Sequence, residues 1–368
     1  MNSIPVLVAP YPYEVIIGKG LLASAGAQVI STLVHRPTKC AIITAQPIWK
    51  HWGRTLEKSL SATEHECFVL KVPDGECNKN IRVIEKLLHG MAKHGADRSS
   101  IVIALGGGVV CDMAGFAASI YMRGIPVVQI PTTLLAQVDA AIGGKTGVDL
   151  KAGKNLAGTF HQPSLVIVDP VVLRTLPERE YRSGLFEVIK CAIIRDARLL
   201  EYIEENRKAI LARNPSTVQH IIEASVKVKA DVVSSDERES GLRRILNFGH
   251  TIGHAIEAAT GYKHLLHGEG VAWGMIAAIQ ISCKMKMLSD ELATLMTDLV
   301  LSYGPLPPIR VSCKQIIKFL ASDKKSVSGV PHFVLLNGIC STRVRDDVPL
   351  SLICEIVDSI LVQSKKSR

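Results

Sequence analysis

The sequence predicts a two-domain fold, with an α/β domain on a mostly parallel sheet over residues 1–176 and a helical domain over residues 177–368. In the first half, short β-branched runs alternate with amphipathic segments, and from about Ser183 the apolar residues recur with a period near 3.6. The stretch "DPVVLRTLPEREYRS", rich in prolines and charges, lies between the two patterns. It therefore marks a domain boundary near residue 176.

Six runs in the first half are expected to be strands, and most of them end at glycine, proline or aspartate. They are "YEVIIG", "KCAIITA", "CFVLKVP", "SIVIALG", "PVVQIPT" and "SLVIVDP". Amphipathic segments such as "NIRVIEKLLHGMAKHG" separate several of them, which indicates helices on the faces of the sheet. Ligands of such folds bind at the carboxyl ends of the strands, where this sequence places its glycines.

The second half is expected to be an all-α domain, because its apolar residues repeat at helical spacing. The segments that show this spacing are "SGLFEVIKCAIIRDARLLEYIEENRKAIL", "TVQHIIEASVKVKADVV", "RRILNFGHTIGHAIEAAT", "VAWGMIAAIQISCKMKM" and "SDELATLMTDLVLSYG". The sequence contains no internal repeat and no low-complexity segment.

Composition limits the class of protein and of ligand. A chain of 368 residues is longer than one domain with a single hydrophobic core usually is. A content of 47% hydrophobic and 21% charged residues is typical of a soluble globular protein. The net charge of +9 is compatible with nucleic-acid binding, but aromatic residues make up only 5% and basic runs are confined to the terminal "SKKSR". The charge therefore favours a basic pocket for a small anionic molecule over a nucleic-acid surface.

Hydropathy and cysteine usage predict a cytoplasmic protein without membrane spans. The most apolar run, "SSIVIALGGGVVCDMAGFAASIYM", is interrupted by three glycines and Asp112, and the first residues lack the pattern of a secretory signal. The nine cysteines are scattered and form no CxxC pair, which argues against both a disulfide framework and a structural zinc site.

Three consecutive glycines, Gly106 to Gly108, lie between an expected buried strand and the start of a helix. Glycine lets the backbone approach a ligand closely, and the free amides of a helix start favour phosphate. Asp112, one turn into that helix, can accept a hydrogen bond from a ribose hydroxyl. The segment is not GxGxxG, so a plain strand-to-helix turn is an equally good explanation.

"AAIGGKTGVD" is not a P-loop, because the first glycine of that motif would have to be residue 139, which is an aspartate. We expect a loop here that carries charged and amide groups inside apolar stretches, unlike an ordinary solvated loop. These groups are Asp139, Lys145, Lys154 and Asn155. The segment "PDGECNKN", with Asp74, Glu76, Lys79 and Asn80, has the same character.

Polar residues recur at intervals of three and four within the apolar stretch from Leu242 to Gly270. They are Arg243, Asn247, His250, His254 and Glu257. On a single helix they would form one stripe within about 80°. Solvated helix faces consist mainly of Lys, Glu and Gln, so this composition favours a functional stripe. Gly249 and Gly253 would each cost this helix about 1 kcal/mol, and we expect close packing there to compensate.

The histidines are candidate metal ligands, although imidazoles satisfied within a core remain an alternative. "HTIGH" lacks the glutamate of HExxH, which disfavours a metalloprotease. Either His250 or His254 can bind a metal while the other serves the substrate. His267 begins the next apolar helix, and Glu187 is the best carboxylate because its neighbours are almost all apolar. A His/His/Glu set with an open position is typical of catalytic zinc.

Nine stretches, in order from about residue 70 to 325, resemble those of a single enzyme family. They are "PDGECNKN", "ALGGGVVCDMAGFAAS", "YMRGIPVVQIPTTLLAQVDAAIGGKTGVD", "GKNLAGTFHQP", "TLPERE", "GLFEVIK", "SSDERESGLRRILNFGHTIGHAIE", "HGEGVAWGM" and "DKK". The family that the sequence resembles is the 3-dehydroquinate synthases, lyases of the shikimate pathway to chorismate and the aromatic amino acids.

The resemblance implies a Rossmann-like NAD-binding domain, a helical metal- and substrate-binding domain, and a homodimer. It also implies that Glu187, His250 and His267 hold zinc or cobalt. The substrate contacts that it implies are Asp139, Lys145, Asn155, Lys190, Lys229, Arg243, Asn247, His254 and Lys325, with Arg123 reaching in from the partner subunit. The NAD contacts that it implies are Asp74, Glu76, Lys79, Gly107, Gly108, Asp112, Thr132, Thr133, Lys145, Lys154, Thr175, Leu176 and Glu180.

The implied reaction converts 3-deoxy-D-arabino-heptulosonate 7-phosphate to 3-dehydroquinate and phosphate. Oxidation of C5 by NAD acidifies the neighbouring C–H so that phosphate can be eliminated, and the reduced cofactor then returns its hydride. A metal at the C4 and C5 hydroxyls polarises the ketone, while lysines and arginines neutralise the departing phosphate. Ring opening and an intramolecular aldol step close the carbocycle.

The sequence departs from the family pattern near the expected nucleotide site. Thr44 and Ala45 stand where the family often has an acidic or amide residue close to the adenosine ribose, and Cys111 replaces a usual glycine. In "DKK", either Lys324 or Lys325 contacts the phosphate.

Three other functions compete with this interpretation. A metal-dependent NAD polyol dehydrogenase would form net NADH, and a non-enzymatic binding module would not need NAD and metal sites together. A sister sugar phosphate cyclase, making an inosose or a valiolone, would share both sites. Lys229, Arg243, Asn247 and His254 favour the dehydroquinate branch, because a substrate with a carboxylate needs such donors.

Overall fold

The computed structural model describes residues 1–32, 37–63, 65–321 and 331–366, and the chain divides into two compact units. Unit 1 comprises Met1–Pro177 and Val218–Arg238, and unit 2 comprises Glu178–Thr217 and Glu239–Arg368. The first division lies next to the boundary expected near residue 176, but residues 218–238 return to unit 1, which the sequence analysis did not anticipate. The functions assigned to the two domains stay predictions. Among the described helices, none has both the length and the apolar character that a membrane span requires.

Unit 1 is built on a seven-stranded sheet in the order β1-β2-β9-β6-β5-β3-β4. Its strands are β1 (Asn2–Val6), β2 (Tyr13–Ile17), β3 (Lys39–Ala45), β4 (Glu66–Val72), β5 (Ile101–Gly106), β6 (Val127–Pro131) and β9 (Leu165–Val168). All neighbours pair in parallel except the edge strand β1, which runs antiparallel to β2. The six runs expected to be strands correspond to β2 through β6 and β9, so the α/β prediction for this half is confirmed.

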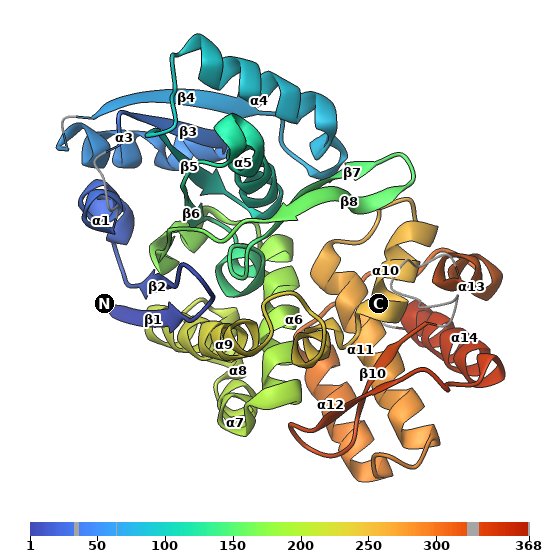
Figure 1. Cartoon of the computed structure of the whole chain (residues 1–368). Helices are drawn as coiled ribbons and strands as arrows, with labels where there is room; N and C mark the ends of the chain where they lie inside the picture. The colour runs from blue at the N-terminus through green and yellow to red at the C-terminus, as the bar shows by residue number, and fades with distance from the viewer. Residues whose placement is uncertain (33–36, 64, 322–330, 367–368) are drawn as a thin grey trace. The chain divides into compact units, whose positions relative to one another are not determined.

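Helices cover both faces of this sheet. Successive strand residues point to opposite sides, so the buried apolar residues of a strand contribute to a core on each face. On β3, Ala41 and Ile43 join the core beneath α4 and α5, while Cys40 and Ile42 join the core beneath α1 and α3 (Figure 1). The helices of unit 1 are α1 (Ala25–Thr32), α2 (Gln46–Ile48), α3 (Arg54–Ser61), α4 (Ile81–Lys93), α5 (Gly108–Ile120) and most of α9 (Pro215–Ser235). Its shorter helical turns are η1 (Leu21–Ser24), η2 (Trp49–Gly53), η3 (Glu76–Asn78), η4 (Tyr121–Arg123), η5 (Ala136–Ala140) and η6 (Pro170–Thr175).

Residues 145–160 form an antiparallel hairpin of β7 (Lys145–Leu150) and β8 (Gly153–Phe160), so the expected loop is wrong over this range. Gly158 pairs with Gly147 across the hairpin. A Cβ atom on Gly158 would lie 2.2 Å from the carbonyl oxygen of Thr146, so the two backbones come together where neither residue has a side chain. The same glycines weaken the alternation by which a strand is recognised in a sequence.

The described part of unit 2 is helical, as expected, apart from one short hairpin. Its helical elements are α6 (Glu178–Arg195), α7 (Ala197–Glu205), α8 (Arg207–Leu211), η7 (Leu242–Asn247), α10 (His250–Ala259), α11 (His267–Lys284), α12 (Asp290–Ser302), α13 (Cys313–Ala321) and α14 (Leu350–Lys366). The antiparallel strands β10 (Phe333–Leu336) and β11 (Thr342–Arg345) form the hairpin, which the all-α expectation did not include. The central helix α11 is buried along most of its length and packs against α6, α10, α12 and α14.

Candidate functional site

Helices α10 and α11 approach each other at backbone distance, which places the histidines close together. A Cβ atom on Gly274 would lie 1.7 Å from the carbonyl oxygen of Gly249, and one on Gly253 would lie 2.8 Å from that of Gly270. No side chain fits at such positions, so these glycines allow the contact. The close packing expected at Gly249 and Gly253 is therefore confirmed.

The polar stripe does not lie on one helix, so this expectation is wrong. Arg243 and Asn247 belong to the 3-10 helix η7, and α10 begins only at His250. Between them, Gly249 adopts a left-handed backbone with φ 79°, which interrupts the helix. Met275 and Val271 of α11 crowd this turn, and glycine is the residue that tolerates both the conformation and the contact.

Two of the histidines direct the same ring nitrogen toward one carboxylate. His250 Nδ1 lies 3.1 Å from the carbonyl oxygen of Phe248, and His267 Nδ1 lies 3.0 Å from Glu257 Oε1. Carbonyl and carboxylate oxygens carry no hydrogen, so in both rings Nδ1 donates and the neutral imidazole keeps its lone pair on Nε2. These Nε2 atoms lie 3.9 and 3.6 Å from Glu187 Oε1.

Glu187 is a buried carboxylate on α6 that faces this pair of imidazoles. Its side chain is 1% exposed and forms an ion pair with Lys190, one turn further along the same helix and equally buried. The apolar neighbours of Glu187 in the sequence predicted a buried carboxylate, and this burial is confirmed. The structure thus brings together Glu187, His250 and His267, the three residues predicted to bind a metal.

His254 completes the cluster. One ring nitrogen from each of His250, His254 and His267 lies within 4.8 Å of the others. Burial opposes a charge on His267, but Glu257 and Glu187 outweigh burial and raise the pKa of His267 to about 10. The carboxylates therefore favour a positive charge here, which either a proton or a metal ion supplies. His264, by contrast, is exposed on the turn before α11.

In unit 1, Lys79 organises a second group of predicted residues. This lysine is 3% exposed, forms an ion pair with Asp112 of α5, and donates a hydrogen bond of 2.5 Å to Asn155 Oδ1 of β8. Burial acts to lower the pKa of Lys79, but Asp112 and Glu76 raise it above its ordinary value. Glu76 itself pairs with Lys154 at 3.1 Å. The structure therefore joins the segment after β4, helix α5 and the β7–β8 hairpin through charges.

The glycine turn follows β5. Beside this strand, the order in which the chain adds strands to the sheet changes direction. Strand β3 pairs with β4 on one side and with β5 on the other, and β5 continues to β6, away from β4. Gly107 caps α5 with an extended backbone, and a Cβ atom there would lie 3.0 Å from Thr133 Cγ2. The expected position between a strand and a helix start is confirmed. These glycines allow another group to approach the backbone closely, and none of them adopts a left-handed conformation.

Lys229 of α9 forms an ion pair with Asp139 of η5, although ninety residues separate them in the sequence. Lys229 Nζ also donates to the carbonyl oxygen of Asp139 at 2.7 Å. This contact lies within unit 1, because residues 218–238 return to it. Two predicted substrate contacts are thus neighbours for a reason that sequence spacing could not reveal.

The remaining predicted residues have various surroundings. Arg123 is exposed on η4 with φ 70°, and Thr175 Oγ1 accepts a hydrogen bond of 2.9 Å from Trp52 Nε1. Lys324 and Lys325 lie outside the described residues. The other predicted residues occupy the element ends and turns given above, namely Asp74 before η3, Gly108 at the start of α5, Thr132 and Thr133 after β6, Lys145 at the start of β7, Leu176 after η6 and Glu180 on α6.

Two acidic residues that contact predicted site residues were not themselves assigned to the site. Glu257 binds the ring of His267, and Glu239 accepts a hydrogen bond from Asn247 Nδ2. Glu257 belonged to the predicted stripe, so its buried position on α10 was a usable signal. Glu239 lies on a loop with φ 60°, and no periodicity distinguishes it from the charged residues around it.

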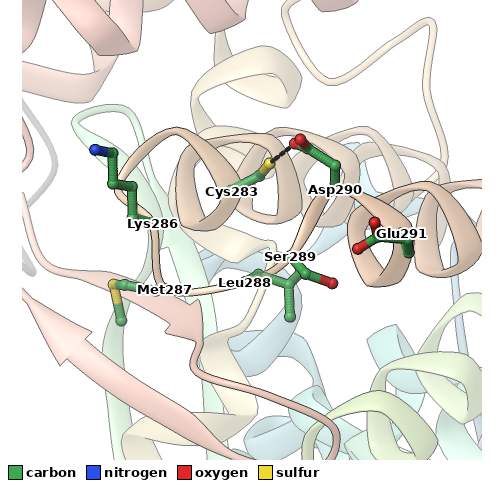
Figure 2. A pocket seen from close by; sticks show the side chains of 7 residues that line it. All are labelled: Cys283, Lys286, Met287, Leu288, Ser289, Asp290 and Glu291. Carbon is green, nitrogen blue, oxygen red and sulfur yellow. Dashed lines mark hydrogen bonds between the residues drawn. The ribbon is translucent and has the colours of Figure 1, made fainter.

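A separate hollow in unit 2 is not this site. Figure 2 shows its lining around the turn between α11 and α12. The hollow has a volume of about 480 Å³. Cys283 Sγ lies 2.9 Å from Asp290 Oδ1 at its rim. Cys283 is sixteen residues along α11 from His267, or about 24 Å at 1.5 Å per residue. None of the predicted site residues lines the hollow.

Known proteins resemble the chain along nearly its whole length. A family model described as 3-dehydroquinate synthase N-terminal matches residues 69–183, and one described as 3-dehydroquinate synthase C-terminal matches residues 184–326. The 3-dehydroquinate synthase of Koribacter versatilis is 49% identical over 98% of both chains. That of Solibacter usitatus is 49% identical over 95% of this chain and 96% of its own.

Solved structures of other proteins also resemble the chain along nearly its whole length. The 2-epi-5-epi-valiolone synthase ValA of Streptomyces hygroscopicus, with NAD⁺ and Zn²⁺ bound, has a TM-score of 0.88 and 28% identity over 97% of this chain and 98% of its own. A 2-deoxy-scyllo-inosose synthase complexed with carbaglucose-6-phosphate, NAD⁺ and Co²⁺ has a TM-score of 0.88 and 25% identity over 97% and 100%. An iron-containing alcohol dehydrogenase, at 16% identity and a TM-score of 0.68, shares the fold alone. The chain belongs to the 3-dehydroquinate synthase family.

Proposed function

We propose that the chain converts 3-deoxy-D-arabino-heptulosonate 7-phosphate to 3-dehydroquinate and phosphate, with NAD and a divalent metal as cofactors. The observation that carries this proposal is the convergence of His250 Nε2 and His267 Nε2 on one oxygen of Glu187. Three lone-pair donors that face one another favour a shared cation, which a proton or a metal ion can supply. In a chain of this family, that arrangement supports the metal-dependent reaction over a purely structural role.

Glu187, His250 and His267 are the proposed metal ligands. Two imidazole nitrogens and one carboxylate suit zinc or cobalt, and both rings already have Nδ1 engaged as a donor. Of the solved relatives, ValA carries Zn²⁺ and the inosose synthase carries Co²⁺. When bound, such a metal polarises the oxygen at C5 of the substrate. His254 is then assigned to hydrogen-bond with the substrate.

The proposed NAD site lies at the carboxyl ends of β3 and β5. Nucleotides bind parallel sheets where successive connections leave in opposite directions, as they do between these two strands. The backbone of Gly107 and Gly108 at the start of α5 can approach a pyrophosphate, and the helix start favours its charge. NAD supplies hydride acceptance and return at C5 of the substrate. Asp112, which forms an ion pair with Lys79, is assigned to accept a hydrogen bond from a ribose hydroxyl.

The proposed substrate contacts are cations and amides in each unit, together with the carboxylate of Asp139. In unit 2, Lys190 and Arg243 are 1% and 2% exposed, and such desolvated cations interact strongly with an anionic substrate. Asn247, fixed by Glu239, supplies an amide. In unit 1, the assigned contacts are Asp139, Lys145, Asn155 and Lys229. The lysines and Arg243 bind the carboxylate and phosphate and stabilise the phosphate as it leaves.

The deciding experiment supplies the purified protein with NAD, Zn²⁺ and the heptulosonate phosphate. We expect inorganic phosphate and 3-dehydroquinate to form in equal amounts without net NADH, because the hydride returns to the substrate. Stoichiometric NADH would indicate a polyol dehydrogenase instead. Equal turnover of a heptulose phosphate that lacks the carboxylate would indicate a sister cyclase.

A homodimer in the cytoplasm is the proposed state of the enzyme. Arg123, which the resemblance assigns to the partner subunit's active site, is exposed and follows Ile120 and Met122 in the chain, two apolar residues that are 40% and 44% exposed. Such a patch suits a contact between subunits. The nine cysteines are free, which suits a reducing compartment. Light scattering on the purified protein gives its mass, and a monomer at micromolar concentration would contradict the dimer.

A further inference from the structure

Glu257 is a buried acid that contacts a proposed metal ligand. It lies near the end of α10, is 2% exposed, and accepts a hydrogen bond of 3.0 Å from Nδ1 of His267, the first residue of α11. A buried carboxylate needs compensation by a charge or a donor, so its presence in this packed contact calls for a reason.

We propose that Glu257 is a positioning residue that orients His267 for the metal, and that Gly270 provides the space that Glu257 needs. This inference rests on the proposed metal site. By accepting from Nδ1–H, the carboxylate fixes the ring and directs the lone pair of Nε2 toward Glu187. With the opposite tautomer, a hydrogen on Nε2 would occupy the side where the metal must bind.

The space around Glu257 depends on Gly270, three residues after His267 on α11. A Cβ atom on Gly270 would lie 2.8 Å from Glu257 Oε1, 2.9 Å from its Cγ and 3.3 Å from its Cδ. All three of its nearest contacts thus belong to one side chain. Any larger residue at position 270 would displace the carboxylate from His267.

The start of α11 is held by other contacts, so Glu257 has a separate task. Glu269 accepts hydrogen bonds from the backbone N–H of Leu266 and from Arg179, and the backbone N–H of Gly268 donates to Ser183 Oγ at 3.0 Å. These contacts position the backbone of the segment "HGEG". The hydrogen bond that His267 Nδ1 donates to Glu257 additionally orients the His267 ring.

Zinc affinity of the full-length protein tests this inference. We expect Glu257→Ala to weaken Zn²⁺ binding by about 10–100-fold in competition with a chromophoric chelator. Glu257→Gln keeps an acceptor oxygen of the same size, so we expect a smaller loss. In addition, Co²⁺ bound to Glu257→Ala should show a shifted visible absorption spectrum, which a change remote from the ligands would not produce.

A double-mutant cycle tests the role of Gly270. We expect Gly270→Ala to weaken Zn²⁺ binding in the wild-type background and to add little in the Glu257→Ala background, because the contacts of the added methyl group would be gone. Glu355→Gln, an exposed glutamate of α14 paired with Lys284 at 2.9 Å, is the matched control and should bind Zn²⁺ as the wild type does.

The outcomes separate this inference from the proposed function. If wild type and Glu257→Ala bind Zn²⁺ equally and give the same Co²⁺ spectrum, the positioning role is overturned while the metal site stands. Additive losses in the cycle overturn the role of Gly270. If the wild type binds neither metal, the proposed metal site itself fails. Should Glu257→Ala not fold, the isosteric Glu257→Gln and Gly270→Ala carry the same comparison.

Discussion

Individual histidines in unit 2 differ in what binds their second ring nitrogen, and this difference decides their roles. A carbonyl holds His250 and a carboxylate holds His267, so each presents Nε2 to Glu187. His264 is exposed on the turn before α11. The four imidazoles of one short segment are therefore not equivalent, and residue type alone does not identify a ligand.

His250→Ala should abolish metal binding and activity while NAD binding remains measurable, because the variant removes one of three ligands and leaves unit 1 intact. Calorimetric titrations with Zn²⁺ and with NAD measure the two affinities separately. His264→Ala removes an exposed imidazole a few residues before His267 and serves as the control. Unchanged Zn²⁺ affinity of His250→Ala would contradict its assignment as a ligand.

Lys79→Met should destabilise the protein by about 2 kcal/mol, because it leaves Asp112 in a largely buried position without its cation. The Asp112 side chain keeps 20% exposure, which moderates the loss. Asp112→Asn should recover part of the stability in the Lys79→Met background. Urea unfolding of the single and double variants measures this coupling, and strictly additive losses would show that the two charges do not interact.

At the scale of elements, the break between η7 and α10 depends on a single glycine. Gly249 must adopt φ 79° while α11 lies against it. Because of this turn, Arg243 and Asn247 do not continue the helix that carries His250 and His254. Spacing could predict which polar residues cluster, but it could not show a break that arises from packing between two helices.

Gly249→Ala should destabilise the protein by about 2–4 kcal/mol, since it combines left-handed strain with overpacking against Met275 and Val271. Gly261→Ala is a close control, because Gly261 has φ 64° and a Cβ atom there would meet nothing within 4 Å. We expect that control to lose about 1 kcal/mol, from strain alone. Equal losses in urea unfolding would show that the contact with α11 is relaxed at little cost.

For the whole molecule, the sequence predicted those features that depend on local pattern. The parallel strands were recognised because they are continuous apolar runs, as in β5, which is buried at every position. The hairpin Lys145–Phe160 was not, because its glycines interrupt the alternation. The metal candidates followed from residue type and from an apolar setting around Glu187.

Tertiary pairing explains what the sequence could not predict. The strand order of the sheet, the return of residues 218–238 to unit 1 and the pairing of Lys229 with Asp139 all join distant segments. The hydrogen bond that His267 donates to Glu257 likewise depends on how α10 packs on α11. Composition and spacing do not contain these contacts, and the resemblance to a family supplied the residue assignments without their geometry.

The pH dependence of stability has a component at His161, at the end of β8. Its Nε2 lies 2.9 Å from the carbonyl oxygen of Ile125, and burial lowers its pKa below the ordinary value of about 6.5, with this hydrogen bond only partly opposing the shift. The unfolded chain therefore takes up a proton near pH 6.5 that the folded chain accepts only at lower pH. This contribution to stability is complete above about pH 6.5 and is lost as the pH falls toward the folded pKa.

Between pH 7.5 and 5.5, the thermal midpoint of the wild type should fall more steeply than that of His161→Gln, which keeps a donor but does not titrate. Parallel curves would show that His161 titrates alike in the folded and unfolded chains.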